Sequence, residues 1–245
     1  MKRLAEQGVI PKKISKIKSP LCAACIFGKQ HKRPWRGKGS SGAIRRDTHA
    51  SPGAYSSADQ LISTVPGLIP QVRGILMKAK YTAATKFVDH CTDFKYVHLM
   101  TGTTGEETLE AKHAWERKCA EFQVRIKQYH CDNGRFAEKL FRKDVEDNHQ
   151  TLTFCGVGSH HQNGIAEKKI RDLSDAARSM LVFGRERWPE AVDLSLWPFA
   201  LKAAERANNL YFLDSKGHSP EEKFSRLQHK PRIRNEHPVL SRFCT

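Results

Sequence analysis

Apolar and polar positions follow a strand-like pattern over the middle of the chain, with a helical period between and after the strands. Runs rich in Thr, Phe, Val and Tyr, bounded by Gly, Pro and Asp, predict three successive strands. Beyond them, helical stretches alternate with single short strands, as is typical of α/β proteins. The predicted order is strands at 56–63, 81–94 and 96–100, a helix at 105–122, a strand at 124–130, a helix at 136–147 and a strand at 151–155.

A long amphipathic helix is predicted to begin close to Glu167. The 3.6-residue period of one buried face is carried by its apolar residues, at Ile170, Leu173, Ala177, Met180 and Leu181. Two further helices are predicted at 188–210 and 219–227. The second has Ser219 as its cap and Pro220 in its first position.

The succession of elements predicts the fold class, a mixed five-stranded sheet flanked by helices. The first three strands form a meander, and the later strands run parallel to the first through helical crossovers. Sites in such sheets lie beyond the carboxyl ends of the strands. Asp59 lies in the first strand and Asp132 follows the fourth. If these two strands are neighbours in the sheet, both aspartates face one crevice, with Glu167 at its rim.

The charge of the chain is concentrated at its ends. The net charge is +16; residues 1–46 hold 13 Lys and Arg against one Glu, residues 47–215 hold 22 of each sign, and residues 216–245 hold 7 against 3. Basic arms on a neutral core indicate binding to a polyanion, above all a nucleic acid, although a solvated arm that binds nothing has the same composition. No apolar run approaches the ~18 residues of a membrane span, so no membrane partner is expected. The seven scattered cysteines are typical of a reduced intracellular protein.

Three carboxylates are the candidate catalytic residues: Asp59, Asp132 and Glu167. Hard oxygen donors of this kind suit Mg²⁺, or Mn²⁺ in its place, in phosphoryl transfer. Each has a plain alternative. Asp132-Asn133-Gly134 is also a hairpin-turn sequence, and Asp89 or Asp93 competes with Asp59.

The predicted helix also carries a polar stripe, formed by Glu167, Arg171, Ser174 and Arg178. Arg171 and Arg178 could hold DNA phosphates, or the stripe could be an ordinary surface with a Glu–Arg pair four residues apart. Cys22 and Cys25 form a CxxC, which is half of a tetrahedral zinc site. Without an upstream histidine pair, zinc is not expected there.

Several of these segments together resemble the integrase core of copia-type retrotransposons. They are Asp59 in a strand, residues 131–134 (CDNG), and residues 160–167 (HHQNGIAE). Asp132 and Glu167 stand 35 positions apart, as in the D,D,E pattern of that superfamily. Residues 22–31 are similar to the end of the zinc-binding segment that precedes those cores, and residues 219–224 to the segment that follows them.

The resemblance implies a ribonuclease-H-like fold and a Mg²⁺-dependent polynucleotidyl transferase that trims element DNA ends and joins them to target DNA. Asp59, Asp132 and Glu167 would be the metal ligands, with Asp132 bridging two ions. DNA strands would be positioned by Asn133, Gln162, Asn163, Arg171 and Arg178. The resemblance also implies a homo-oligomer on DNA, located in the nucleus or in a cytoplasmic particle before nuclear entry.

The expected organisation has four parts. Residues 1–35 are a basic, partly disordered arm with the zinc-segment remnant, 36–53 a linker, 54–212 the catalytic core, and 213–245 a basic extension. Because the histidine pair of the zinc segment is missing, the chain could instead be a catalytically silent DNA-binding remnant, or a co-opted nucleic-acid-binding module. A nuclease of the same fold, which uses water as its nucleophile, would share all three carboxylates.

Overall fold

The computed structural model describes residues 2–17, 21–30, 51–70, 78–154 and 164–226. Five strands form one mixed sheet, as the sequence predicts, and their order in the sheet is β3-β2-β1-β4-β5. β1 pairs antiparallel with β2, β2 antiparallel with β3, β1 parallel with β4, and β4 parallel with β5. The strands are β1 (Ser56–Gly67), β2 (Tyr81–Asp89), β3 (Lys95–Met100), β4 (Gln128–Cys131) and β5 (Thr151–Phe154).

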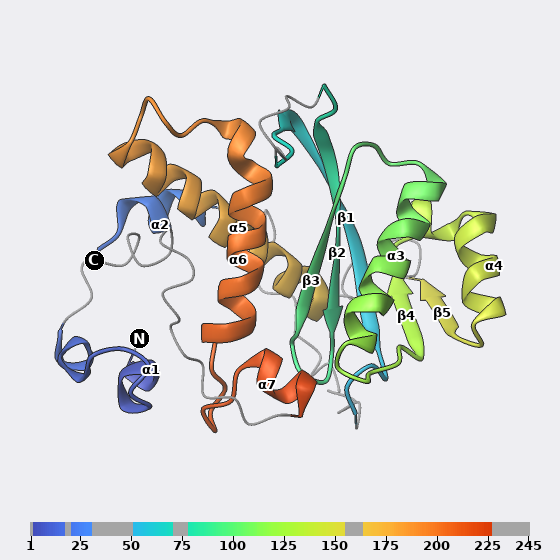
Figure 1. Ribbon diagram of the computed structural model, residues 1–245, viewed down its shortest axis with the longest axis horizontal. Helices are drawn as coiled ribbons and strands as arrows, with labels where there is room; N and C mark the ends of the chain where they lie inside the picture. The colour runs from blue at the N-terminus through green and yellow to red at the C-terminus, as the bar shows by residue number, and fades with distance from the viewer. Residues whose placement is uncertain (1, 18–20, 31–50, 71–77, 155–163, 227–245) are drawn as a thin grey trace, which may run out of the picture.

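Helices cover both faces of this sheet (Figure 1). One face carries α3 (Gly105–Ala120) and α4 (Lys139–Asp147), and the other carries α5 (Gly164–Arg187) and α6 (Trp197–Tyr211). The inner strand β2, between β3 and β1, is buried continuously from residue 83 to residue 89. Its alternate residues enter different cores, Ala83 and Phe87 on the α3 side, Ala84 on the α5 side. The strand therefore has no solvent-facing side along this stretch.

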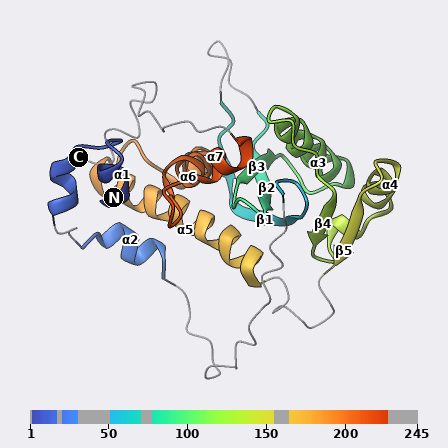
Figure 2. The same cartoon turned by 90° about the horizontal axis from the view of Figure 1, so that it is seen from below.

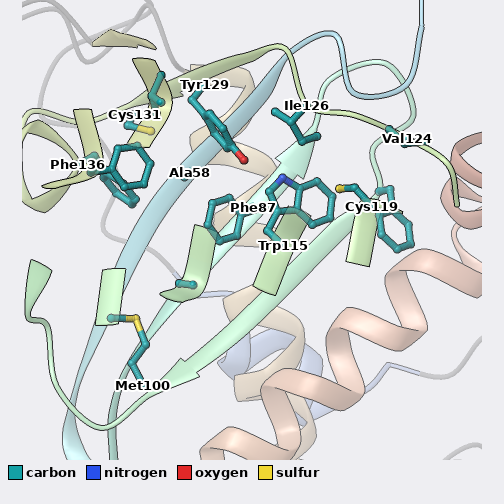
Figure 3. Packing of buried hydrophobic residues seen from close by; sticks show 14 of the residues in the cluster. Ala58, Phe87, Met100, Trp115, Cys119, Val124, Ile126, Tyr129, Cys131 and Phe136 are labelled. Atoms are coloured by element: carbon teal, nitrogen blue, oxygen red, sulfur yellow. The ribbon is translucent and has the colours of Figure 1, made fainter. Parts of the chain in front are cut away.

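Aromatic packing dominates the α3 side, as Figure 3 shows. Trp115 of α3 is fully buried and stacks on Phe87 with the ring centroids 5.8 Å apart. Phe224 reaches the same cluster from α7 (Pro220–Ser225), with its centroid 4.5 Å from that of Phe94. The C-terminal helix is thus part of the core that supports the sheet.

Capping fixes the two helices that the sequence delimits best. Ser219 accepts a hydrogen bond from the Glu222 amide while the Glu222 carboxylate accepts one from the Ser219 amide, a reciprocal capping box. Pro220 occupies the first position, where its missing N–H is harmless. The predicted cap is confirmed. Thr104 and Glu107 form the same box at the start of α3.

Some predicted boundaries are wrong. The helix expected at 188–210 is instead η3 (Leu194–Leu196) followed by α6 from Trp197, while α5 continues to Arg187. Pro198 explains this start, because proline is tolerated only in the first turn of a helix. The first strand runs on to Gly67, the second ends at Asp89, and the fourth begins only at residue 128. The helix expected at 136–147 is η2 (Arg135–Ala137) and then α4.

Short helices form in the N-terminal stretch, for which composition predicts extended or partly disordered chain: α1 (Lys2–Glu6), η1 (Lys12–Lys16) and α2 (Ala23–Gly28). α2 lies along α5 in both views (Figures 1 and 2). Gly28 is required by this approach, since a Cβ atom there would lie 2.7 Å from the Ser179 Cα. Among the described helices, none combines the length and the apolar character needed to cross a bilayer.

Candidate active site

Asp59 points to the α5 face of the sheet. It pairs with Lys86 across the antiparallel β1–β2 ladder, and its neighbour Ala58 pairs with Phe87. Ala58 and Phe87 belong to the core on the α3 side. Because successive side chains of a strand alternate between faces, Asp59 and Lys86 both face α5. Asp59 is half-buried there.

Asp132 comes to the same face through the parallel β1–β4 pair. The register pairs Ser57 with His130, and β4 ends at Cys131, so an extension of the register by two residues would set Asp132 level with Asp59. Cys131 lies in the α3-side core together with Ala58, so the residue after it turns to the other side. Asp132 is exposed, and its Oδ1 accepts a 3.3 Å hydrogen bond from the Gly134 amide. The register therefore favours the two predicted aspartates on one face of the sheet, and their joint role stays a prediction.

The start of α5 lies over the same face. Glu167 is in the first turn of this helix, and its side chain lies outside the described residues. One turn on, Ile170 packs against Val88, whose β1 partner is Ser57. The helix then passes over β2, where the Ser174 Oγ accepts a 3.1 Å hydrogen bond from the Lys86 Nζ. The helix that carries Glu167 is thus anchored on the strand beside Asp59.

Asp89, one of the two competing aspartates, has a structural role. It is fully buried at the end of β2 and accepts hydrogen bonds from the Gly53 amide (2.9 Å), the Thr92 amide (2.9 Å) and the Thr92 hydroxyl (2.7 Å). Burial raises the pKa of Asp89, and these three donors oppose that rise. Asp93 lies in the same turn with a φ of 67°. Both residues belong to the β2–β3 connection.

The other predicted DNA-contacting residues are dispersed. Asn133 and Arg171 are exposed, at the end of β4 and in the second turn of α5. Arg178 is half-exposed; its Nη1 donates a 3.0 Å hydrogen bond to the Gly28 carbonyl of α2 and lies 3.5 Å from the Asp175 carboxylate. Gln162 and Asn163 lie outside the described residues. Arg178 therefore already joins α5 to α2.

Known structures resemble this arrangement, although no family model and no curated protein sequence matches the chain. The HTLV-2 integrase catalytic core domain in complex with magnesium (trimeric form) matches with a TM-score of 0.50 and 15% identity, over 71% of this chain and 98% of that one. A simian T-cell lymphotropic virus intasome matches with a TM-score of 0.55 and 16% identity, over 84% of this chain and 62% of that one. The fold is that of a retroviral integrase catalytic core.

Within this integrase-like fold, Asp59 and Asp132 fit a divalent metal ion. Two carboxylates on one face of neighbouring parallel strands are the hard donors that Mg²⁺ and Mn²⁺ prefer. Among the residues whose side chains are described, no three His, Cys, Asp or Glu residues gather closely enough to form a metal site. The pair is therefore two-thirds of the predicted ligand set, and Glu167 would complete it.

Lys86 is the residue of this site that the sequence prediction missed. Its side chain is only 4% exposed, although it stands directly opposite Asp59. Burial lowers the pKa of Lys86, and the nearby carboxylates Asp59 and Asp175 oppose that change. The sequence did contain a signal for this residue, because Lys86 is flanked by Ala, Thr, Phe and Val in a predicted strand. A lysine in such an apolar run is expected to be buried, and buried lysines are rare unless they are paired with an opposite charge.

Cys22 and Cys25 lie at the start of α2, far along the chain from the carboxylates. Cys22 is the cap of this helix, and its Sγ accepts a 3.4 Å hydrogen bond from the Cys25 amide. Burial and the adjacent Cys22 raise the pKa of Cys25. Both cysteines are free thiols, and the Cys22 thiol caps the start of α2. The expectation that they hold no zinc stays a prediction.

Proposed function

We propose that this protein is the integrase of a copia-type retrotransposon, a metal-dependent polynucleotidyl transferase that trims the ends of element DNA and joins them to target DNA. The observation that supports the proposal is the parallel β1–β4 register of an integrase-like sheet, which favours Asp59 and Asp132 on one face, together with α5, which carries Glu167 in its first turn. The motifs around residues 131–134 and 160–167 support the copia type.

In this proposal Asp59, Asp132 and Glu167 would hold Mg²⁺ or Mn²⁺. The ions would lower the barrier by stabilising charge on the attacking and leaving oxygens. The reaction is an exchange of phosphodiesters. The attacking hydroxyl oxygen forms a bond to phosphorus, the bond to the 3′ oxygen of the cut strand breaks, and the proton of the attacking hydroxyl is balanced by protonation of the leaving oxygen.

Double-stranded DNA is the proposed partner. Arg171 lies exposed one turn after Glu167, where it would meet a backbone phosphate, and Asn133 lies exposed beside Asp132. The basic arms would add attraction that does not depend on sequence. A homo-oligomer on paired DNA ends, and a nuclear or particle-associated location, belong to the same proposal.

The test is an end-processing and joining assay on labelled duplex oligonucleotides, with Mg²⁺ or Mn²⁺ at low salt. We expect shortened and joined products from the unaltered protein and none from Asp132→Asn. Asp147→Asn is the matched control, because Asp147 is exposed at the end of α4 on the opposite face of the sheet. Its products should equal those of the unaltered protein.

Two other results would replace the proposal. Metal-dependent nicking without joining would identify a nuclease of the same fold. Salt-sensitive DNA binding without any products, equal in Asp132→Asn and the unaltered protein, would identify a catalytically silent DNA-binding remnant or co-opted module, which the excess positive charge of the arms would serve equally well.

A further inference from the structure

A buried cation stands inside the candidate metal site. Lys86 lies directly opposite Asp59 in the β1–β2 ladder, and opposed side chains of an antiparallel pair have Cβ atoms about 4.5–5.5 Å apart. Asp132 directly follows β4, the parallel neighbour of β1, and an extension of the β1–β4 register would set it level with Asp59. The lysine therefore belongs to the same small area of the sheet as the two carboxylates.

Side chains of α5 hold Lys86 in this position. Its Nζ donates a 3.1 Å hydrogen bond to the Ser174 Oγ, and Asp175, which is 5% exposed, is the second carboxylate near the lysine. Asp175 also lies 3.5 Å from the Arg178 guanidinium, so Lys86 shares this carboxylate with another cation. With only 4% of its surface exposed, the lysine has no route to withdraw into solvent. The Lys86 side chain is therefore held within the fold, against α5.

We propose that Lys86 weakens the binding of a divalent metal ion at Asp59 and Asp132, because its ammonium group places a positive charge beside Asp59. This inference rests on the proposed function, because it assumes that the metal ion binds at these carboxylates. Like charges repel, and the repulsion is stronger near a protein surface than in bulk water. A fixed ammonium so close to a divalent ion would reduce its affinity by about tenfold or more.

The lysine then has two effects on the protein. It balances the charge of Asp59 when no metal is bound, so the sheet tolerates a carboxylate that is half-buried. It also makes metal loading depend on a high concentration of the divalent ion, or on bound DNA whose phosphates add negative charge to the site. Loss of the lysine charge should remove both effects, with tighter metal binding by the free protein.

The experiment is a calorimetric titration of the full-length chain with Mn²⁺ in the absence of DNA. We expect Lys86→Met to bind Mn²⁺ about tenfold more tightly than the unaltered protein. Lys95→Met is the matched control: Lys95 is also a buried strand lysine (8% exposed), but its Nζ hydrogen-bonds to Asn208 of α6. This control removes the same charge from the chain and should leave the affinity unchanged.

Asp132→Asn separates failure of this inference from failure of the proposed function. If Asp132→Asn abolishes Mn²⁺ binding but Lys86→Met binds no more tightly than the unaltered protein, the role of Lys86 is overturned and the site stands. If Asp132→Asn binds Mn²⁺ normally, the site itself is misplaced and both are overturned. Circular dichroism shows whether Lys86→Met folds. If it does not, Lys86→Gln is the second variant, because it removes the charge and retains an amide donor for Ser174. An unchanged Mn²⁺ affinity in Lys86→Gln would equally refute the inference.

Discussion

Replacement of Asp89 by alanine tests whether this aspartate stabilises the fold, while Asp59 of the neighbouring strand serves the proposed metal site. The buried Asp89 carboxylate accepts two backbone amide hydrogen bonds, from Gly53 and Thr92, and one from the Thr92 hydroxyl. In Asp89→Ala both buried amides lose their acceptor, at about 1–3 kcal/mol each. Relief of the buried charge offsets part of this loss, since burial already raises the pKa of Asp89. We expect a net destabilisation of about 3 kcal/mol.

Urea unfolding, followed by tryptophan fluorescence, measures this loss. With a denaturant slope of about 2–3 kcal/mol per molar, the unfolding midpoint should fall by about 1 M. Asp59→Asn is the comparison, because this half-buried side chain lies outside the turn, and its midpoint should shift by about 0.5 M or less. An Asp89→Ala protein with an unchanged midpoint and lost DNA-joining activity would refute the reasoning, because Asp89 would then act in catalysis and not in the turn.

Three further predictions concern stability and DNA affinity. Lys112→Met should destabilise the fold by about 2–3 kcal/mol in thermal or urea unfolding, because the fully buried ammonium lies 2.6 Å from the Asp144 carboxylate, itself 19% exposed; an unchanged midpoint would contradict this. Burial alone would raise the pKa of Asp144, but hydrogen bonds from Lys112 and His113 outweigh it and lower the pKa below 3.8, so this contribution is present above pH 3.8 and lost as the pH falls further. Asp144→Asn should therefore flatten the acid limb of a stability–pH curve, and an identical limb would count against the linkage. Arg171→Gln should reduce the salt slope of DNA binding by about one unit, whereas Lys143→Gln, which removes an exposed charge from α4, should not.

The succession of strands along the chain, and the positions of the two aspartates in or directly after a strand, could be predicted because each depends on local signals. Alternating apolar residues delimit the strands, and Asp132 directly follows one of them. An extension of the parallel β1–β4 register would then set Asp132 level with Asp59. The structural role of Asp89, which argues against it as a metal ligand, could not be predicted from the sequence. This role depends on the Gly53 amide, which lies 36 residues away in the chain and which only the fold brings close.

Long-range packing also explains the other features that the sequence did not reveal. Lys86 has an ordinary position in a strand run, and only the tertiary structure shows that Ser174 and α5 cover it. The docking of α2 on α5 depends on Gly28, which fits against the Ser179 backbone without a side chain of its own. Arg178 was predicted to contact DNA from its spacing to Glu167, yet its guanidinium already binds the Gly28 carbonyl. A helical stripe shows which residues share a face but not what that face packs against.

The most direct test of the proposed activity is the transfer of a labelled duplex oligonucleotide into a supercoiled plasmid by the purified full-length chain with Mn²⁺. The proposal predicts label covalently joined to relaxed or linear plasmid, and its disappearance in both Asp59→Asn and Asp132→Asn but not in Asp147→Asn. Plasmid that is nicked but never labelled, or labelled equally by all four proteins, would contradict the account.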